Sequence, residues 1–259
     1  DEKGMNPEIL ESKLAELKAN GEKPKFIYVI PDFQNPAGTT MPEERRVEIL
    51  AIAKKYDILV VEDSPYRELR FTGKPQRMLY DLDGGEGNVI TLGTFSKIFM
   101  PGFRMGWVLA HPMVIDNFVK AKQNTDLCTS AFLQKITVKF FQKNYFEANV
   151  QKIVDLYRGK LNAMIGAFEK YMPEGVTWTH PEGGLFLFLT IPEGLDCEEL
   201  FSIAIEKNVA FVLGTVFFCN GEGKNTMRIN FSYMSEEENI EGVRRLADSI
   251  RELYKRHGR

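Results

Sequence analysis

The chain has 259 residues, of which 44% are hydrophobic and 27% charged, a composition that is normal for a folded protein of one large or two ordinary domains. Its formal net charge is -3, so it has no basic field for DNA or RNA, and we expect no nucleic-acid partner. Cys128, Cys197 and Cys219 are too few and too scattered for a disulfide framework, which favours a reducing, cytoplasmic setting. The longest nearly apolar stretch, residues 209–219, is too short to cross a membrane.

The first part of the chain alternates helical patterns with short apolar strands. The stretch at residues 5–24 predicts a capped helix, with Asn6 as its cap and Pro7 in its first turn, and residues 42–56 predict an amphipathic helix. Strands are predicted at residues 25–30, 58–63, 88–93 and 104–110. Their continuous Val/Ile/Leu runs are typical of strands covered on both faces. We therefore expect an α/β domain with a mostly parallel sheet.

The second part of the chain has a different pattern. Residues 111–171 predict mostly helix, interrupted by a polar segment at 122–130. After Pro173, strands are predicted within residues 176–192, 209–214 and 226–234, and helices at 196–208 and 236–256. This mixture indicates an α+β unit. We expect the carboxy-terminal portion of a large domain over residues 1–145 and a smaller α+β domain over residues 146–259.

Polar side chains follow three of the predicted parallel strands, at the point where each strand ends. They are Asn35 after the first strand, Asp63 and Tyr66 at the second, and Thr94, Ser96 and Lys97 after the third. Ligands of open parallel sheets bind at the carboxyl ends of the strands. Because these ends meet at one edge, we expect the six side chains to lie around a common site, with Arg104 as a nearby cation.

Pyridoxal phosphate (PLP) is the ligand that uses all of these groups together. Its aldehyde forms a Schiff base with a lysine, and its protonated ring nitrogen pairs with an aspartate. Its phenolic oxygen needs neutral donors, which Asn35 and Tyr66 supply, and its phosphate needs hydroxyls and a guanidinium such as that of Arg104. The three histidines have no ligand spacing, so no metal site is expected.

Several motifs together carry a resemblance to a known family. NPAG, VVEDSPYREL, GTFSKIFMPGFRMGW, GGLFLFL and MRINFS, in this order and spacing, resemble the class I aminotransferases, which have PLP-dependent transferase fold type I. FQNPAGTT and AKQNTDLCTS are similar to the branch that acts on 2-aminoadipate, kynurenine and aromatic amino acids. The resemblance implies a homodimeric enzyme that moves an amino group between such an L-amino acid and a 2-oxo acid, such as 2-oxoglutarate.

The resemblance also implies roles for single residues. Lys97 would be catalytic, carrying the Schiff base and moving the substrate proton. Asp63 would pair with the ring nitrogen, while Asn35 and Tyr66 would bind the phenolic oxygen. Arg228 would clamp the substrate α-carboxylate, with Asn35 beside it. The phosphate would be held by Thr94, Ser96 and Arg104.

One departure from the family pattern leaves other functions open. The family's N-terminal segment, with its first strands, a phosphate cradle and an aromatic that stacks on the ring, is absent from this sequence. We therefore expect the chain to be the carboxy-terminal majority of a longer protein, with that segment as its partner. A DNA-binding head could lie there, as in transcriptional regulators with an aminotransferase-like domain. A PLP lyase or decarboxylase is the other alternative.

Each residue also has a purely structural interpretation. Lys97 would then be a lysine whose stem lies on an apolar surface, and Asp63 a helix cap or turn former. Asn35 would belong only to an Asn-Pro turn, and Tyr66 would be a half-buried aromatic. Arg228 would form a structural salt bridge in its strand. Thr94 and Ser96 would be ordinary loop hydroxyls, and Arg104 a surface residue.

Overall fold

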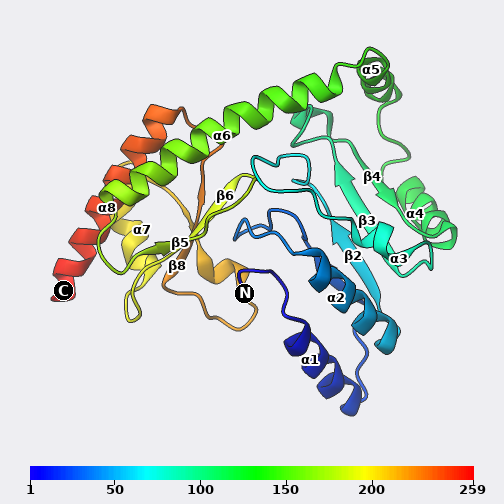
Figure 1. The fold of residues 1–259 in the computed structure, drawn as a ribbon, viewed down its shortest axis with the longest axis horizontal. Helices are drawn as coiled ribbons and strands as arrows, with labels where there is room; N and C mark the ends of the chain where they lie inside the picture. The colour runs from blue at the N-terminus through cyan, green and yellow to red at the C-terminus, as the bar shows by residue number, and fades with distance from the viewer. The chain divides into compact units, whose positions relative to one another are not determined.

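The computed structural model describes residues 1–259 as two compact units (Figure 1). The first unit comprises residues 1–34 and 39–153, and the second comprises residues 35–38 and 154–259. The division falls within helix α6 (Phe146–Tyr171). The domain boundary near residue 145 stays a prediction, because a compact unit is not by itself an independently folding domain.

A four-stranded sheet forms the centre of the first unit. Its order is β1 (Phe26–Val29), β2 (Leu59–Asp63), β3 (Val89–Thr94) and β4 (Gly106–Leu109). The first three strands are parallel, and β4 runs antiparallel to β3. The predicted α/β fold with a mostly parallel sheet is confirmed. β4 begins two residues later than predicted, because Arg104 takes a left-handed backbone conformation after the short helix η1 (Pro101–Phe103).

Helices cover one face of this sheet. Helix α2 (Glu43–Tyr56) packs there, with α1 (Pro7–Ala19) and the short α3 (Leu79–Asp83) beside it. The core that they share contains Leu14, Ile27, Val29, Ile49, Leu50, Ile52, Ala53, Val60, Leu79 and Val89. Asn6 caps α1 as predicted, since its Oδ1 accepts hydrogen bonds from the backbone N–H groups of Glu8 and Ile9.

The opposite face of the sheet is less covered, because side chains alternate between the two faces along each strand. On β1, Ile27 and Val29 are buried, whereas the intervening Tyr28 is 47% exposed. On β2, Val60 and Glu62 are buried, and the last residue, Asp63, is only partly buried. The side chains of Tyr28 and Asp63 therefore share the open face.

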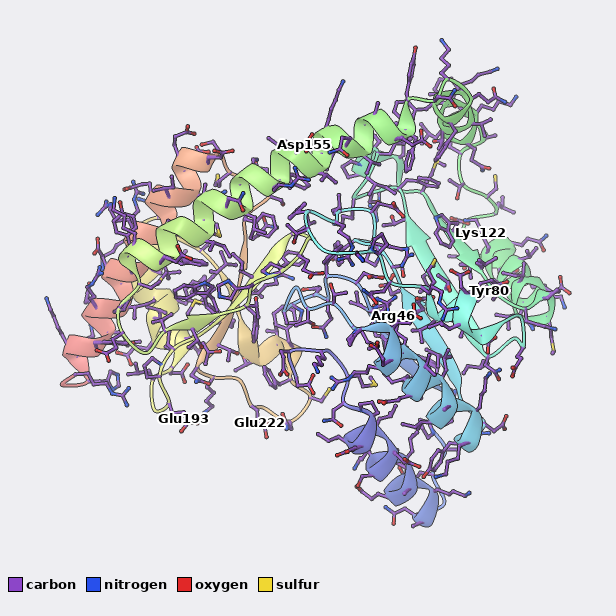
Figure 2. All side chains as sticks on the ribbon, viewed as in Figure 1. Arg46, Tyr80, Lys122, Asp155, Glu193 and Glu222 are labelled. Atoms are coloured by element: carbon purple, nitrogen blue, oxygen red, sulfur yellow. The ribbon has the colours of Figure 1, made fainter.

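A buried ion pair fixes the loop that follows β1. Arg46 of α2 (Figure 2) is fully buried and donates to both carboxylate oxygens of Asp32, at 2.9 and 3.3 Å. Its guanidinium also donates to the carbonyl oxygens of Pro31, Met41 and Arg77. A buried charge that is paired and fully hydrogen-bonded in this way holds the backbone around it in one arrangement.

The first unit also contains α4 (Pro112–Thr125), α5 (Ala131–Gln142) and the start of α6. They lie in the predicted helical region, but α4 extends through Thr125, so the predicted interruption at 122–130 is shorter and covers residues 126–130. No helix of either unit is both long enough and apolar enough to cross a membrane.

The second unit is built on a small antiparallel sheet, which confirms the predicted α+β pattern. Its order is β5 (Thr177–Trp178), β6 (Phe186–Thr190), β8 (Thr226–Asn230) and β7 (Val212–Leu213). The remainder of α6, α7 (Cys197–Glu206), the short η2 (Gly214–Phe217) and α8 (Glu236–Arg256) complete it. A reciprocal capping box between Ser235 and Glu238 fixes the start of α8.

Candidate active site

Asp63 lies at the carboxyl end of β2, on the open face of the first unit's sheet. The phenol of Tyr28 donates to Asp63 Oδ2, with Oη 2.6 Å from that oxygen. Tyr28 is the register partner of Val61, so Asp63 lies two residues further along the same face. Tyr28 is not among the site residues predicted from the sequence. Only the strand register, which is a tertiary feature, could have paired the two residues.

The hydroxyls predicted to bind a phosphate are brought together with Arg104. Thr94 Oγ1 accepts from the backbone N–H of Ser96 at 3.1 Å and donates to the carbonyl of Met105 at 3.2 Å. Arg104 Nη1 donates to Ser96 Oγ at 3.4 Å and to the carbonyl of Pro101 at 3.3 Å. The exposed guanidinium and the two hydroxyls thus form a group suited to an anion.

Arg104 has an unusual backbone for a residue of its type. Its φ is 54°, in the left-handed region, which is uncommon for residues with a long side chain and costs about 1–2 kcal/mol. This conformation ends η1 and precedes β4, which pairs Gly106 with Thr94. The turn therefore returns the chain to the end of β3, where Ser96 and Lys97 lie.

Lys97 is exposed, in the turn after β3, and forms no ion pair with an acidic side chain. The next residue, Ile98, is buried, and its carbonyl oxygen accepts a hydrogen bond from Asn149 Nδ2 at 3.0 Å. This contact holds the turn that carries the lysine. Tyr66 is buried in the segment after β2, with 7% of its surface exposed.

Asn35 and Arg228 lie together in the second unit. Arg228 Nη1 donates to Asn35 Oδ1 at 2.7 Å, and the guanidinium lies over the ring of Phe186, 4.2 Å from its centroid. The ring of Phe217 lies 5.3 Å away. Neither aromatic contact was predicted from the sequence. The strand register explains the contact with Phe186, because it pairs Arg228 with Phe188 and places Phe186 on the same face of the sheet.

Within the second unit, the segment that carries Asn35 packs closely against the start of β6. Gly38 has a φ of 72°, and a Cβ added there would come within 2.8 Å of both the Phe186 carbonyl and Pro181 Cβ. Only glycine fits this approach of two backbones without strain. The close packing at Gly38 thus keeps the Asn35 segment beside β6.

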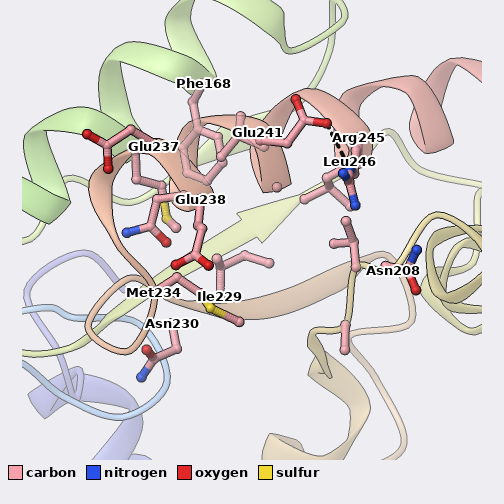
Figure 3. Close-up of a pocket in the computed structure, with 16 residues that line it drawn as sticks. Phe168, Asn208, Ile229, Asn230, Met234, Glu237, Glu238, Glu241, Arg245 and Leu246 are labelled. Carbon is pink, nitrogen blue, oxygen red and sulfur yellow. Dashed lines mark hydrogen bonds and ion pairs between the residues drawn. The ribbon is translucent and has the colours of Figure 1, made fainter.

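A separate cavity of about 500 Å³ lies in the second unit, between α6, α8 and β8 (Figure 3). None of the predicted site residues lines it. Of the charged residues that line it, Arg245 Nε donates to Glu241 Oε1 at 2.7 Å, and Glu238 belongs to the capping box. The cavity is thus distinct from the groups described above.

Comparison with known proteins decides the family. The sequence profile of aminotransferase class I and II matches residues 1–246. The chain belongs to this family. It is 48% identical, over 99% of its length, to aromatic-amino-acid aminotransferase 1 of Thermococcus litoralis, of which it covers 61%. It thus spans about three fifths of that relative's length.

Solved structures of the family have the same fold. A multiple substrate aminotransferase from Thermococcus profundus superposes with a TM-score of 0.95 at 49% identity, covering 99% of this chain and 63% of that one. LysN, an α-aminoadipate aminotransferase from Thermus thermophilus complexed with N-(5'-phosphopyridoxyl)-L-leucine, superposes with a TM-score of 0.91 at 38% identity. That match covers 98% of this chain and 64% of LysN. The family predicted from the sequence motifs is confirmed.

Proposed function

We propose that the protein is a PLP-dependent aminotransferase that moves an amino group between an L-amino acid and a 2-oxo acid. The observation that carries the proposal is the group on the first unit's sheet: a carboxylate at the end of β2, and hydroxyls with a guanidinium after β3. Membership of the aminotransferase family and the phosphopyridoxyl ligand of the LysN structure support it.

The chemistry of the donor set fits PLP. Asp63 offers a carboxylate to a protonated ring nitrogen, and Ser96 with Arg104 offers donors to a phosphate. Lys97 presents an amine that forms no ion pair with an acidic side chain. The buried Tyr66 and the amide of Asn35 carry neutral donors for a phenolic oxygen. When bound, PLP supplies an electron sink for the charge that develops at the substrate α-carbon.

In this proposal each of these residues has a separate role. Lys97 Nζ would hold the cofactor aldehyde and would accept the proton that the substrate α-carbon loses. Asp63 keeps the ring nitrogen protonated by placing a negative charge beside it. Thr94, Ser96 and Arg104 anchor the phosphate and so fix the cofactor's orientation.

Substrate recognition is assigned to the second unit. The planar guanidinium of Arg228 offers parallel donors that match a carboxylate, and Phe186 and Asn35 hold it in place. Every α-amino acid has this carboxylate, so Arg228 accounts for the class of substrate. For the side chain we propose 2-aminoadipate-like or aromatic amino acids, a choice supported by the names of the relatives above. We propose a 2-oxo acid such as 2-oxoglutarate as the amino-group acceptor.

We also propose that a preceding segment of the same protein completes the site. The greater length of the relatives supports this, as do the exposed apolar side chains on both edge strands, Phe26 and Tyr28 on β1 and Trp107, Val108 and Leu109 on β4. The relatives reported above, at 38–49% identity, are named as aminotransferases, whereas two proteins named as transcriptional regulators match at only 29% and 31% identity. This difference favours the enzyme over the regulator that the sequence left open.

The proposed homodimer rests on exposed apolar side chains, and the proposed cytoplasmic setting rests on the state of the cysteines. Large apolar side chains are exposed on and beside α4 and α5, where a partner could bury them; they include Met113, Phe118, Val119, Leu127, Phe132 and Val138. Cys128, Cys197 and Cys219 are all free thiols, which is typical of a reducing compartment.

Borohydride reduction of the full-length protein tests the cofactor and the lysine together. The protein should be yellow, reduction should abolish its absorbance band, and a peptide map should place the pyridoxyl group on Lys97. Lys97→Ala should remove this label. Lys122→Ala is the matched control, because Lys122 pairs with Asp126 on an exposed helix face. A pyridoxyl group on any other lysine would overturn the assignment.

A further inference from the structure

We propose that Tyr28 is a positioning residue that acts through Asp63: its phenol holds one carboxylate oxygen so that the other stays directed at the cofactor ring nitrogen. The inference rests on the proposed function and assigns a role to a residue outside the predicted site. It is carried by the hydrogen bond from Tyr28 Oη to Asp63 Oδ2, at 2.6 Å.

The strand geometry makes this contact specific. Tyr28 lies opposite Val61 in the parallel register of β1 and β2, and Asp63 lies two residues further along the same face. A long aromatic side chain is needed to reach across that offset. Asp63 is the last residue of its strand, so without the phenol its carboxylate could rotate about the side-chain bonds.

Packing alone does not account for the tyrosine. Its neighbours Ile27 and Val29 are 5% and 4% exposed, whereas Tyr28 is 47% exposed and contributes little to the core. A phenylalanine would fill the same space. What the hydroxyl adds is a hydrogen bond to a charged group, which is stronger than a bond between neutral groups.

The phenol also stays protonated, as a donor must. Partial burial of the ring raises the pKa of Tyr28 above its usual range, and the hydrogen bond to Asp63, the charge of Asp63 and the nearby Tyr66 raise it further. Asp63 and Tyr66 are the titratable groups that face it. Tyr28 therefore donates to Asp63 throughout the pH range in which an enzyme of this family would work.

The test is PLP affinity, measured by titrating the full-length apoprotein and following absorbance. Tyr28→Phe should raise the Kd for PLP about tenfold, the size expected for loss of a hydrogen bond to a charged group. Tyr254→Phe is the control, because it removes another phenol, one that donates to the Glu174 carbonyl in the second unit. That variant should leave the Kd unchanged.

A double-mutant cycle separates positioning from a structural role. Asp63→Ala removes the acceptor, so adding Tyr28→Phe to that variant should change the Kd for PLP by less than about twofold. An equal loss in both backgrounds would overturn the proposal, as would a wild-type Kd in Tyr28→Phe. Failure of the wild-type protein to bind PLP would instead overturn the proposed function, and the Tyr28 role with it. Normal wild-type binding with an unaffected Tyr28→Phe variant would overturn this inference alone.

Discussion

Arg228 and Asn35 are 193 residues apart in the sequence, yet Arg228 Nη1 donates to Asn35 Oδ1 at 2.7 Å. The contact orients the arginine that we propose binds the substrate carboxylate. The guanidinium also lies over Phe186, and stacking of this kind favours arginine over lysine. The amide and the ring together leave Arg228 one preferred orientation.

Arg228→Lys should therefore raise KM for both the amino acid and the oxo acid, by about tenfold or more, because lysine keeps the charge but loses the paired donors and the stacking. Steady-state kinetics of the full-length protein with each substrate varied in turn measures this. Arg244→Lys is a suitable control, since Arg244 lies on an exposed face of α8 with Glu241. Normal KM values for both substrates would show that Arg228 is not the clamp.

Asp63→Asn should still bind PLP but should transaminate more slowly by orders of magnitude. The amide keeps the shape of the carboxylate and loses the charge that keeps the ring nitrogen protonated, and such electrostatic contributions are typically worth several kcal/mol in the transition state. Single-turnover rates of the loaded variant measure the effect.

Asp57→Asn gives the matched control for Asp63→Asn. Asp57 is an exposed aspartate with a left-handed backbone at the end of α2, which asparagine also adopts readily, and it pairs with Lys23 at the surface. Its turnover should remain near that of the wild-type protein. If Asp63→Asn also turned over at that rate, Asp63 would be a structural residue.

Gly93→Ala should destabilise the first unit. Gly93 pairs with Trp107 across β3 and β4, and a Cβ added at Gly93 would overlap the indole ring. Overpacking of this kind costs about 1–3 kcal/mol, so we expect Tm to fall by a few degrees. Gly102→Ala meets nothing within 4 Å and should leave Tm nearly unchanged. Equal Tm values for the two variants would mean that the indole moves aside at no cost.

Much of the fold follows from local sequence patterns. Apolar runs predicted the strands of the first sheet, and Asn6 with Pro7 predicted the start of α1. The short helix α3 was missed because five residues rarely form a helix without tertiary support. That support comes from Glu62, whose carboxylate accepts hydrogen bonds from the backbone N–H groups of Leu79 and Tyr80.

The candidate site also contains some residues that local sequence predicts and others that only the tertiary structure brings together. Thr94 is the last residue of β3, and Ser96 and Arg104 follow it closely in the sequence, so their proximity could be predicted from the local sequence. Tyr28 was hidden within an apolar run, because its partner is set by the register of two strands. Register depends on how whole strands pair, and no local pattern specifies it here.

Glu62 gives a prediction about pH. It is fully buried, and this burial raises its pKa, although hydrogen bonds from Leu79 N–H, Thr91 Oγ1 and Tyr80 N–H act in the opposite direction. The pKa of Glu62 is therefore higher in the folded protein than in the unfolded protein. At pH values between these two pKa values, the unfolded protein binds fewer protons than the folded protein does. The free energy of unfolding therefore decreases as pH rises from the unfolded pKa through the folded pKa, and is level above it.

Glu62→Gln should remove this dependence, because glutamine does not titrate. The difference in unfolding free energy between wild type and variant, measured by denaturant titration from about pH 4 upward, should favour the wild type most at the acid end and decrease as pH rises. For Asp57→Asn we expect the stability difference between wild type and variant to change with pH in the opposite direction, because the hydrogen bond from Lys23 lowers the pKa of Asp57. In that comparison the wild type should gain relative stability as pH rises from the lowered folded pKa of Asp57 to its unfolded pKa of about 4, so this series extends down to about pH 3. A difference for Glu62→Gln that stays constant with pH would mean that Glu62 titrates alike in the folded and unfolded protein.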